Sequence, residues 1–190
     1  ALRSGWDVPD GARVILQAAR LTGWKGQSVL IAAAAKLWQR GALENCVVVL
    51  AGDAQGRDEY VRQLNAEIAA AGLERHVKIV DHVTDIAAAY AAAHVTVVAS
   101  TKPEAFGRSG AEAQAVGCPV IATNIGAPPE TVRADPHVPK AATTGWLVPP
   151  DDPERLAASL AEALALGPAE RQALGARAAV HARGTFTVQT

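Results

Sequence analysis

The sequence predicts an α/β fold with one doubly wound parallel sheet of about six strands and helices on both faces. Short apolar runs rich in β-branched residues recur along the 190 residues, and stretches of helical length separate most of them. Strands that are apolar throughout are typical of parallel sheets covered on both sides. Since helical crossovers between parallel strands are right-handed, this order predicts a Rossmann-like sheet with its ligand at the carboxyl ends of the strands.

The first half of the chain is expected to supply three strands and three helices. Its strands are continuous apolar or β-branched runs, and Gly72 marks the end of the second helix. The expected strands are Arg13–Ala18, Cys46–Ala51 and Val77–Val80, and the expected helices span residues 28–40, 57–71 and 86–93.

The second half repeats the alternation and then becomes helical. Pro103 prevents a simple continuation of the fourth strand, and Asp152 followed by Pro153 is a common helix start. Strands are expected at residues 95–99, Val120–Thr123 and Gly145–Val148, and helices at residues 107–116, 153–166 and 168–183.

Composition limits the classes of protein that remain. A length of 190 residues fits a single domain, and a formal net charge of −1 with scattered basic residues argues against binding to nucleic acid. No apolar run is long enough to span a membrane, so peripheral membrane contact is expected only through parts outside this chain. Cys46 and Cys118 have no metal-ligand spacing, which favours reduced structural thiols and a cytoplasmic location. A start without Met or a leader segment indicates a piece of a longer protein.

The segment from Ser100 to Thr123 combines a strand end, a loop of small residues and a helix start. The helix is expected to begin near Gly107 or Arg108, with Ser109 and Gly110 in its first turn. Free backbone N–H groups and the helix dipole favour an anion there, and phosphate is the natural candidate.

Two carboxylates flank this predicted phosphate site. Glu112 lies one turn into the helix, on the face of Ser109, and Glu104 precedes the helix. Because carboxylates repel phosphate, they are expected to contact neutral groups on either side of it, and sugar hydroxyls fit. A nucleotide sugar, with a ribose and a hexose on a diphosphate, has this layout.

These residues resemble the signature of retaining glycosyltransferases of family four, which have the GT-B fold. The resemblance rests on Pro-Glu-Ala-Phe-Gly-Arg-Ser-Gly-Ala-Glu-Ala at residues 103–113, followed by residues 117–123 and 126–130. It implies that this chain is the C-terminal half, which binds the donor. It also implies that Glu104 contacts the donor sugar, that Glu112 holds the ribose, and that four residues between them meet the phosphates and sugar: Phe106, Gly107, Arg108 and Ser109.

Two other loops complete the predicted site. Arg20 and Lys25 follow the first strand, where two cations can converge on a diphosphate, and the resemblance implies that they neutralise it as it leaves. The chain differs from the family in having Ala19 where Gly is more usual. Val80 and Asp81 end the third strand, where the resemblance implies nucleobase binding. No Asp-x-Asp occurs, so metal-independent transfer without a cofactor is expected.

The sequence therefore predicts the donor-binding domain, residues 1–190, of a glycosyltransferase that moves a hexose from a UDP- or GDP-sugar to an acceptor hydroxyl. The acceptor site is expected in an N-terminal domain absent from this chain, which leaves the 190 residues inactive alone. A non-catalytic nucleotide-sugar-binding module and a sugar-nucleotide epimerase of the same fold stay open as alternatives. The presence together of Arg20, Lys25, Glu104 and Glu112 favours the transferase. No GxGxxG opens a helix, which argues against a dehydrogenase.

Overall fold

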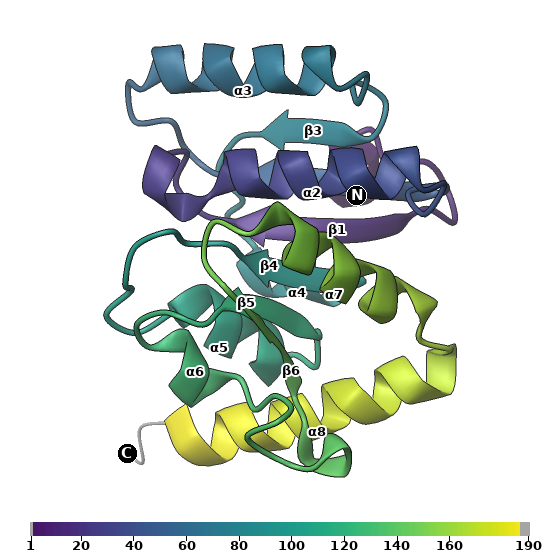
Figure 1. The fold of residues 1–190 in the computed structure, drawn as a ribbon, viewed down its shortest axis with the longest axis vertical. Coiled ribbons are helices and arrows are strands. Elements are labelled where there is room, and N and C mark those ends of the chain that lie inside the picture. The colour runs from purple at the N-terminus through teal and green to yellow at the C-terminus, as the bar shows by residue number, and fades with distance from the viewer. Residues whose placement is uncertain (1, 187–190) are drawn as a thin grey trace.

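The computed structural model describes residues 2–186 and contains one six-stranded sheet (Figure 1). The strands are β1 (Arg13–Ala18), β2 (Cys46–Ala51), β3 (Val77–Val80), β4 (Val95–Val98), β5 (Val120–Thr123) and β6 (Gly145–Val148). Their spatial order is β3-β2-β1-β4-β5-β6, and all neighbouring pairs are parallel. The predicted doubly wound sheet is confirmed.

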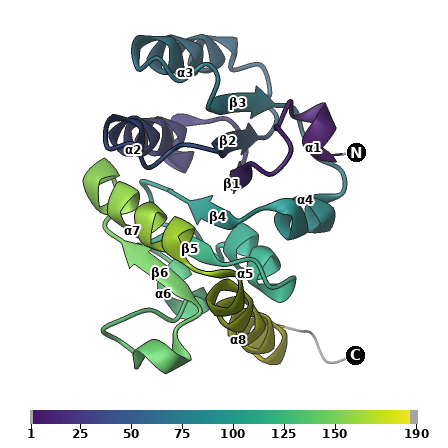
Figure 2. The same cartoon turned by 90° about the vertical axis from the view of Figure 1, so that its right-hand side faces the viewer.

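Helices cover both faces of this sheet (Figure 2). One face carries α2 (Gln27–Gln39), α3 (Asp58–Ala70) and α7 (Pro153–Ala165). The other carries α1 (Leu2–Gly5), α4 (Ile86–Ala92) and α5 (Arg108–Ala115), and α8 (Pro168–Phe186) packs against α5. The short α6 (Pro128–Thr131) follows β5. In the described part of the chain, no helix is both long and apolar enough to cross a membrane.

The side chains of each strand alternate between the two faces of the sheet, so each strand contributes to two hydrophobic cores. On β1, Ile15 faces the α2, α3 and α7 layer, whereas Val14 and Leu16 face α4 and α5. Cys46 and Cys118 are buried free thiols, one in each core. Burial on both faces explains why the strands are apolar along their length.

The predicted element boundaries are close to those observed. Five strands match, and β4 ends at Val98 instead of residue 99. The main helices begin and end within one residue of expectation, except that α8 continues from the predicted residue 183 to Phe186. The sequence did not predict α1 or the 3₁₀ turns at Gly23–Lys25 and Lys140–Ala142, because single turns carry no periodic pattern.

Glycines let the loop after β1 pack tightly against its neighbours. Gly26 has φ 73°, and a Cβ there would lie 1.9 Å from the carbonyl oxygen of Ala99. On the other side, a Cβ on Gly52 would lie 1.9 Å from the carbonyl oxygen of Ala19. The β1 loop is therefore held between the ends of β2 and β4.

The close approach at Gly26 predicts a large loss of stability in the Gly26→Ala variant. We expect a decrease of more than about 3 kcal/mol in the free energy of unfolding, measured by urea denaturation, because backbone strain and a backbone clash combine. Gly41→Ala is the matched control: Gly41 also has positive φ (67°) but open space around it. This control should lose only about 1 kcal/mol from the left-handed conformation. Equal losses in the two variants would contradict the packing described here.

Candidate functional site

Two loops meet at the carboxyl edge of the sheet, one after β1 and one after β4. These strands are adjacent although the fourth is far along the chain, so the loops lie at the point where the strand order reverses. The backbone N–H of Thr101 donates to the carbonyl of Trp24 at 2.8 Å. The buried Gln17 amide donates to the carbonyl of Lys25 at 2.6 Å. Both contacts fix the position of Lys25.

Lys25 and Glu104 form an ion pair at this junction. Lys25 Nζ lies 2.7 Å from Glu104 Oε1, and the two side chains are only 14% and 9% exposed. The Ser100 hydroxyl donates to the same oxygen of Glu104. Lys25 Nζ also lies 4.3 Å from the centroid of the Trp24 ring, a distance suited to a cation–π interaction. The structure therefore brings together two residues that the sequence placed in separate motifs.

The loop between β5 and α6 packs against the backbone of Glu104. Glu104 forms an isolated parallel β-bridge with Gly126, and its carbonyl accepts from the backbone N–H of Ala127 at 3.0 Å. A Cβ at Gly126 would lie 2.5 Å from the backbone nitrogen of Glu104, so only glycine fits. Gly126 and Ala127, which belong to the last part of the predicted motif, thus hold the backbone of Glu104 in place.

The N-terminus of α5 points to the same edge. Gly107, at φ 68°, precedes the helix without a capping side chain, which leaves first-turn N–H groups available for an anion. Ser109 Oγ donates to the carbonyl of Ala18 at 3.2 Å, which ties this turn to the end of β1. Arg108 is exposed. Phe106 is also exposed and meets the ring of Phe186 edge-on, with centroids 5.7 Å apart.

The side chains of Arg20 and Glu112 are exposed to solvent. Within residues 2–186, the Arg20 side chain has no hydrogen bond or ion pair, so its charge is available to a ligand. Its backbone is fixed, since its carbonyl accepts from Gln27 Nε2 at 2.9 Å. Gln27 Oε1 in turn accepts from the Tyr60 hydroxyl at 3.1 Å.

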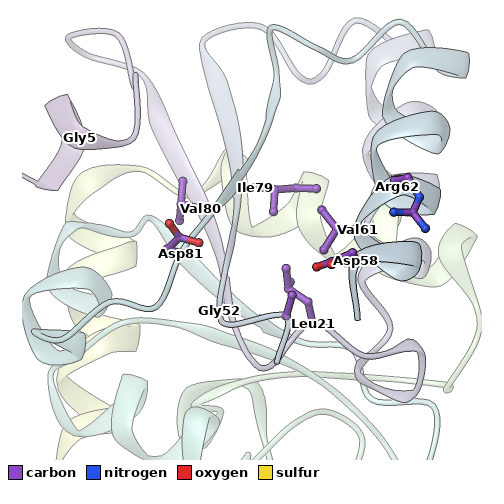
Figure 3. Close-up of a pocket in the computed structure, with 10 residues that line it drawn as sticks. Gly5, Leu21, Gly52, Asp58, Val61, Arg62, Ile79, Val80 and Asp81 are labelled. Atoms are coloured by element: carbon purple, nitrogen blue, oxygen red, sulfur yellow. The ribbon is translucent and has the colours of Figure 1, made fainter. Parts of the chain in front are cut away.

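A cavity of about 620 Å³ opens at the ends of β2 and β3, next to the loop that carries Arg20 (Figure 3). Asp58, Val61 and Arg62 of α3 lie on one side of it, and Val80 and Asp81 lie on the other. Leu21, from the loop that carries Arg20, also lines it. Val80 and Asp81 are the predicted site residues that line this cavity, whereas the ion pair and the start of α5 lie outside it.

Several residues that shape the site were not predicted from the sequence. Ser100 and Gln17 orient Glu104 and Lys25, and Gln27 fixes the carbonyl of Arg20. Asp58 and Arg62 line the cavity from α3. The polar Gln17 within an otherwise apolar strand was a usable signal, because a buried amide requires a hydrogen-bond partner.

A known protein family matches most of the chain. The family model described as glycosyl transferases group 1 matches residues 1–181. The chain belongs to this family. It is 35% identical over 192 residues to a D-inositol 3-phosphate glycosyltransferase of Kineococcus radiotolerans, across 97% of the chain and 43% of that relative. A protein of the same name from Corynebacterium efficiens is 34% identical over 162 residues, across 83% of the chain and 36% of the relative. The chain thus spans less than half the length of these relatives.

Solved structures of group 1 glycosyltransferases and related enzymes share the fold. A glycosyltransferase from Rickettsia africae has a TM-score of 0.88 at 29% identity, over 98% of this chain and 46% of its own. HepE from Anabaena, solved in complex with UDP-glucose, has a TM-score of 0.84 at 30% identity, over 97% of this chain and 47% of its own. The C-terminal domain of a group 1 glycosyltransferase from Francisella tularensis has a TM-score of 0.80 at 26% identity, over 98% and 93%.

The buried ion pair predicts strong coupling between Lys25 and Glu104. Lys25→Met alone should lower the free energy of unfolding by about 3 kcal/mol, because it leaves a largely buried carboxylate unpaired. The double variant Lys25→Met/Glu104→Gln should lose about 1–3 kcal/mol less free energy of unfolding than the two single variants lose together. Urea denaturation of the four proteins measures this. The more exposed pair of Lys36 and Glu154, with side chains 35% and 54% exposed, is the control and should couple by less than about 1 kcal/mol. Additive losses at Lys25 and Glu104 would contradict the pairing.

Proposed function

We propose that this chain is the donor-binding, C-terminal domain of a retaining GT-B glycosyltransferase that uses a nucleoside diphosphate sugar. The observation that carries the proposal is the placement of Lys25 and Glu104 together beside the start of α5. A cation and uncapped N–H groups suit a diphosphate, and a carboxylate next to them suits the hydroxyls of the attached sugar. HepE, which shares the fold, was solved with UDP and with UDP-glucose, which supports a donor of this class.

Each part of such a donor has a counterpart at the carboxyl edge of the sheet. The diphosphate would lie between Lys25, Arg20 and the first turn of α5, where Gly107, Arg108 and Ser109 expose backbone or polar groups. Glu104 would accept hydrogen bonds from the sugar, and Glu112 from the ribose. The nucleobase would enter the cavity lined by Val80 and Asp81, whose acceptors can bind a base N–H.

The reaction proposed for the complete enzyme is transfer of a hexose with retention of configuration. The bond between the anomeric carbon and the diphosphate oxygen breaks, its electron pair moves onto the diphosphate, and the acceptor oxygen bonds to the carbon. Lys25, Arg20 and the α5 N–H groups would stabilise the charge that develops on the leaving group, in place of a metal ion. Glu104 and Glu112 bind hydroxyls in this scheme, and neither is the general base.

The acceptor and its proton would be handled by an N-terminal domain outside this chain. The relatives are more than twice as long as the matched region, which supports a further domain. Inactivity of the 190 residues alone and a cytoplasmic location stay predictions. A non-catalytic binding module and a GT-B epimerase remain the alternatives, and transfer and epimerisation assays on the longer protein separate all three.

The donor site predicts saturable, metal-independent binding of one nucleoside diphosphate. Calorimetric titration with UDP, GDP and ADP should give binding of one of them that is unchanged by EDTA. Lys25→Ala should weaken it about tenfold or more, since one charge-assisted hydrogen bond contributes about 1.5–3 kcal/mol. Lys36→Ala, which removes a partly exposed lysine in the last turn of α2, is the control and should bind normally. The absence of binding of any nucleotide, or binding that requires a metal ion, would contradict the proposal.

The ion pair predicts an opposite effect of Glu104 on the nucleotide and on the nucleotide sugar. Glu104→Gln releases Lys25 from its carboxylate, so UDP without a sugar should bind more tightly, by roughly tenfold for one charged hydrogen bond. The same variant should lose most of the added affinity that UDP-glucose gains over UDP through its sugar. Titrations of both ligands against both proteins measure this difference. Weaker binding of UDP to the variant would show that Glu104 does not compete for Lys25.

A further inference from the structure

Two buried glutamines bind the two ends of the loop that carries Arg20 and Lys25. Gln17, on β1, is 2% exposed, and its Nε2 donates to the carbonyl of Lys25 at 2.6 Å. Gln27, the first residue of α2, is 1% exposed, and its Nε2 donates to the carbonyl of Arg20 at 2.9 Å. Each of the two cations proposed to meet the phosphates thus has its own carbonyl bound by a buried amide.

The bond from Gln17 completes the hydrogen bonding on both sides of the Lys25 backbone. In the peptide group before Lys25, the carbonyl of Trp24 accepts from the backbone N–H of Thr101 at 2.8 Å. In the peptide group after it, the carbonyl of Lys25 accepts from Gln17, and the N–H of Gly26 closes the 3₁₀ turn that contains Lys25. Because each peptide group is planar and both are held, the direction in which the Lys25 side chain leaves the backbone is defined.

The bond from Gln27 holds the backbone at Arg20 in the same way. The carbonyl of Arg20 accepts from Gln27, and the N–H of the same peptide group, that of Leu21, donates to the carbonyl of Asp53 at 3.0 Å. Gln27 Oε1 accepts from the Tyr60 hydroxyl at 3.1 Å, which orients the amide. Tyr60 lies on α3, so one amide joins the Arg20 backbone to the helix that forms a wall of the cavity.

The amide of Gln17 is not explained by the packing of the core. Gln17 lies between Leu16 and Ala18 in a buried strand, and within residues 2–186 no group donates to its Oε1. A buried acceptor without a donor lowers stability, so packing alone would favour an apolar side chain of similar size. The bond that its Nε2 makes to the carbonyl of Lys25 is what the amide contributes.

We propose that Gln17 and Gln27 are positioning residues for diphosphate binding, whose amides hold Lys25 and Arg20 where both charges meet the β-phosphate. This inference rests on the proposed function of the donor site. A loop that is ordered before the ligand arrives does not have to be ordered on binding, which raises the affinity. Neither glutamine touches the ligand in this scheme.

The test compares UDP with UMP, which lacks the β-phosphate, by calorimetric titration. The unmodified chain should bind UDP about tenfold or more tightly, the effect of one hydrogen bond between charged groups. In Gln17→Met, which has a side chain of similar size and no amide, this ratio should fall to about threefold or less while the affinity for UMP stays the same. Gln27→Met should lower the ratio as well. If GDP or ADP is the nucleotide that binds, it is compared with its own monophosphate.

Double variants show whether each glutamine acts through the cation that it holds. In a Lys25→Met background, Gln17→Met should leave the ratio of UDP to UMP affinity unchanged, because the charge that it positions is absent. In an Arg20→Met background, the same is expected of Gln27→Met. A glutamine that only packs the core would lower the affinities for both ligands alike in either background.

Thr144→Val is the matched control. Thr144 is 2% exposed, and its hydroxyl accepts from the backbone N–H of Arg133 at 3.0 Å, so this variant also removes a hydrogen bond between a buried side chain and the backbone. Thr144 directly precedes β6 and lies at the edge of the sheet opposite the proposed site. Its ratio of UDP to UMP affinity should equal that of the unmodified chain.

The outcomes separate the inference from the function on which it rests. If the unmodified chain binds UDP and UMP equally, the proposed diphosphate contacts are wrong, and the role of the glutamines is wrong with them. If it distinguishes them and a glutamine variant does so equally well, that glutamine only packs the core. An effect on the ratio that persists without the cation, or that Thr144→Val shares, also overturns the inference.

Thermal melting checks that the variants are folded. If a glutamine variant is not, hydrogen exchange of that side-chain amide in the unmodified chain takes its place. Slow exchange both without and with UDP supports a loop that is held in advance. Exchange that becomes slow only when UDP binds overturns the inference, because the bond would then form with the ligand and not before it.

Discussion

The adjacency of β1 and β4 is the constraint on which the site depends. Lys25 and Glu104 are 79 positions apart, and only a strand order that places β4 next to β1 brings their loops together. The loops then approach so closely that Gly26 lies against the carbonyl of Ala99 and Thr101 bonds to Trp24. The ion pair is the side-chain consequence of this backbone contact. The predicted residues Arg20, Asp81 and Ser109 follow strand ends or open a helix along the same edge of the sheet.

On the proposed function, the pair also explains how a site for a charged ligand stays stable when no ligand is bound. A lysine and a glutamate that are both largely buried need partners, and in this structure each is the partner of the other. A nucleoside diphosphate sugar would offer each residue a new partner, since its phosphates can accept from Lys25 and its sugar hydroxyls can donate to Glu104. Ligand binding on this account is an exchange of partners, which keeps both charges paired throughout. Ser100, whose hydroxyl donates to Glu104, would restrain that carboxylate during the exchange.

The sequence predicted the strands because they depend on local pattern, and the charged residues of the candidate site could be named from the sequence for the same reason. β2 and β5 are apolar or β-branched throughout, which is typical of strands covered on both faces. Arg20, Lys25, Glu104 and Glu112 follow strand ends or open a helix, where a motif can be recognised. Ser100 and Gln17 were not predicted as parts of the site, because their hydrogen bonds to Glu104 and to the carbonyl of Lys25 depend on how the loops after β4 and β1 fold back, which no local pattern shows. The separation of the cavity at Val80 and Asp81 from the ion pair also follows from the tertiary arrangement of α3, not from any local signal.

The measurement that tests the central claim most directly is a crystal structure of this chain with UDP bound. The account predicts that the β-phosphate lies against Lys25 and the start of α5, that Lys25 Nζ has left Glu104 for a phosphate oxygen, and that the uracil occupies the cavity beside Val80 and Asp81. A structure in which UDP binds elsewhere while the Lys25–Glu104 pair stays intact would contradict it.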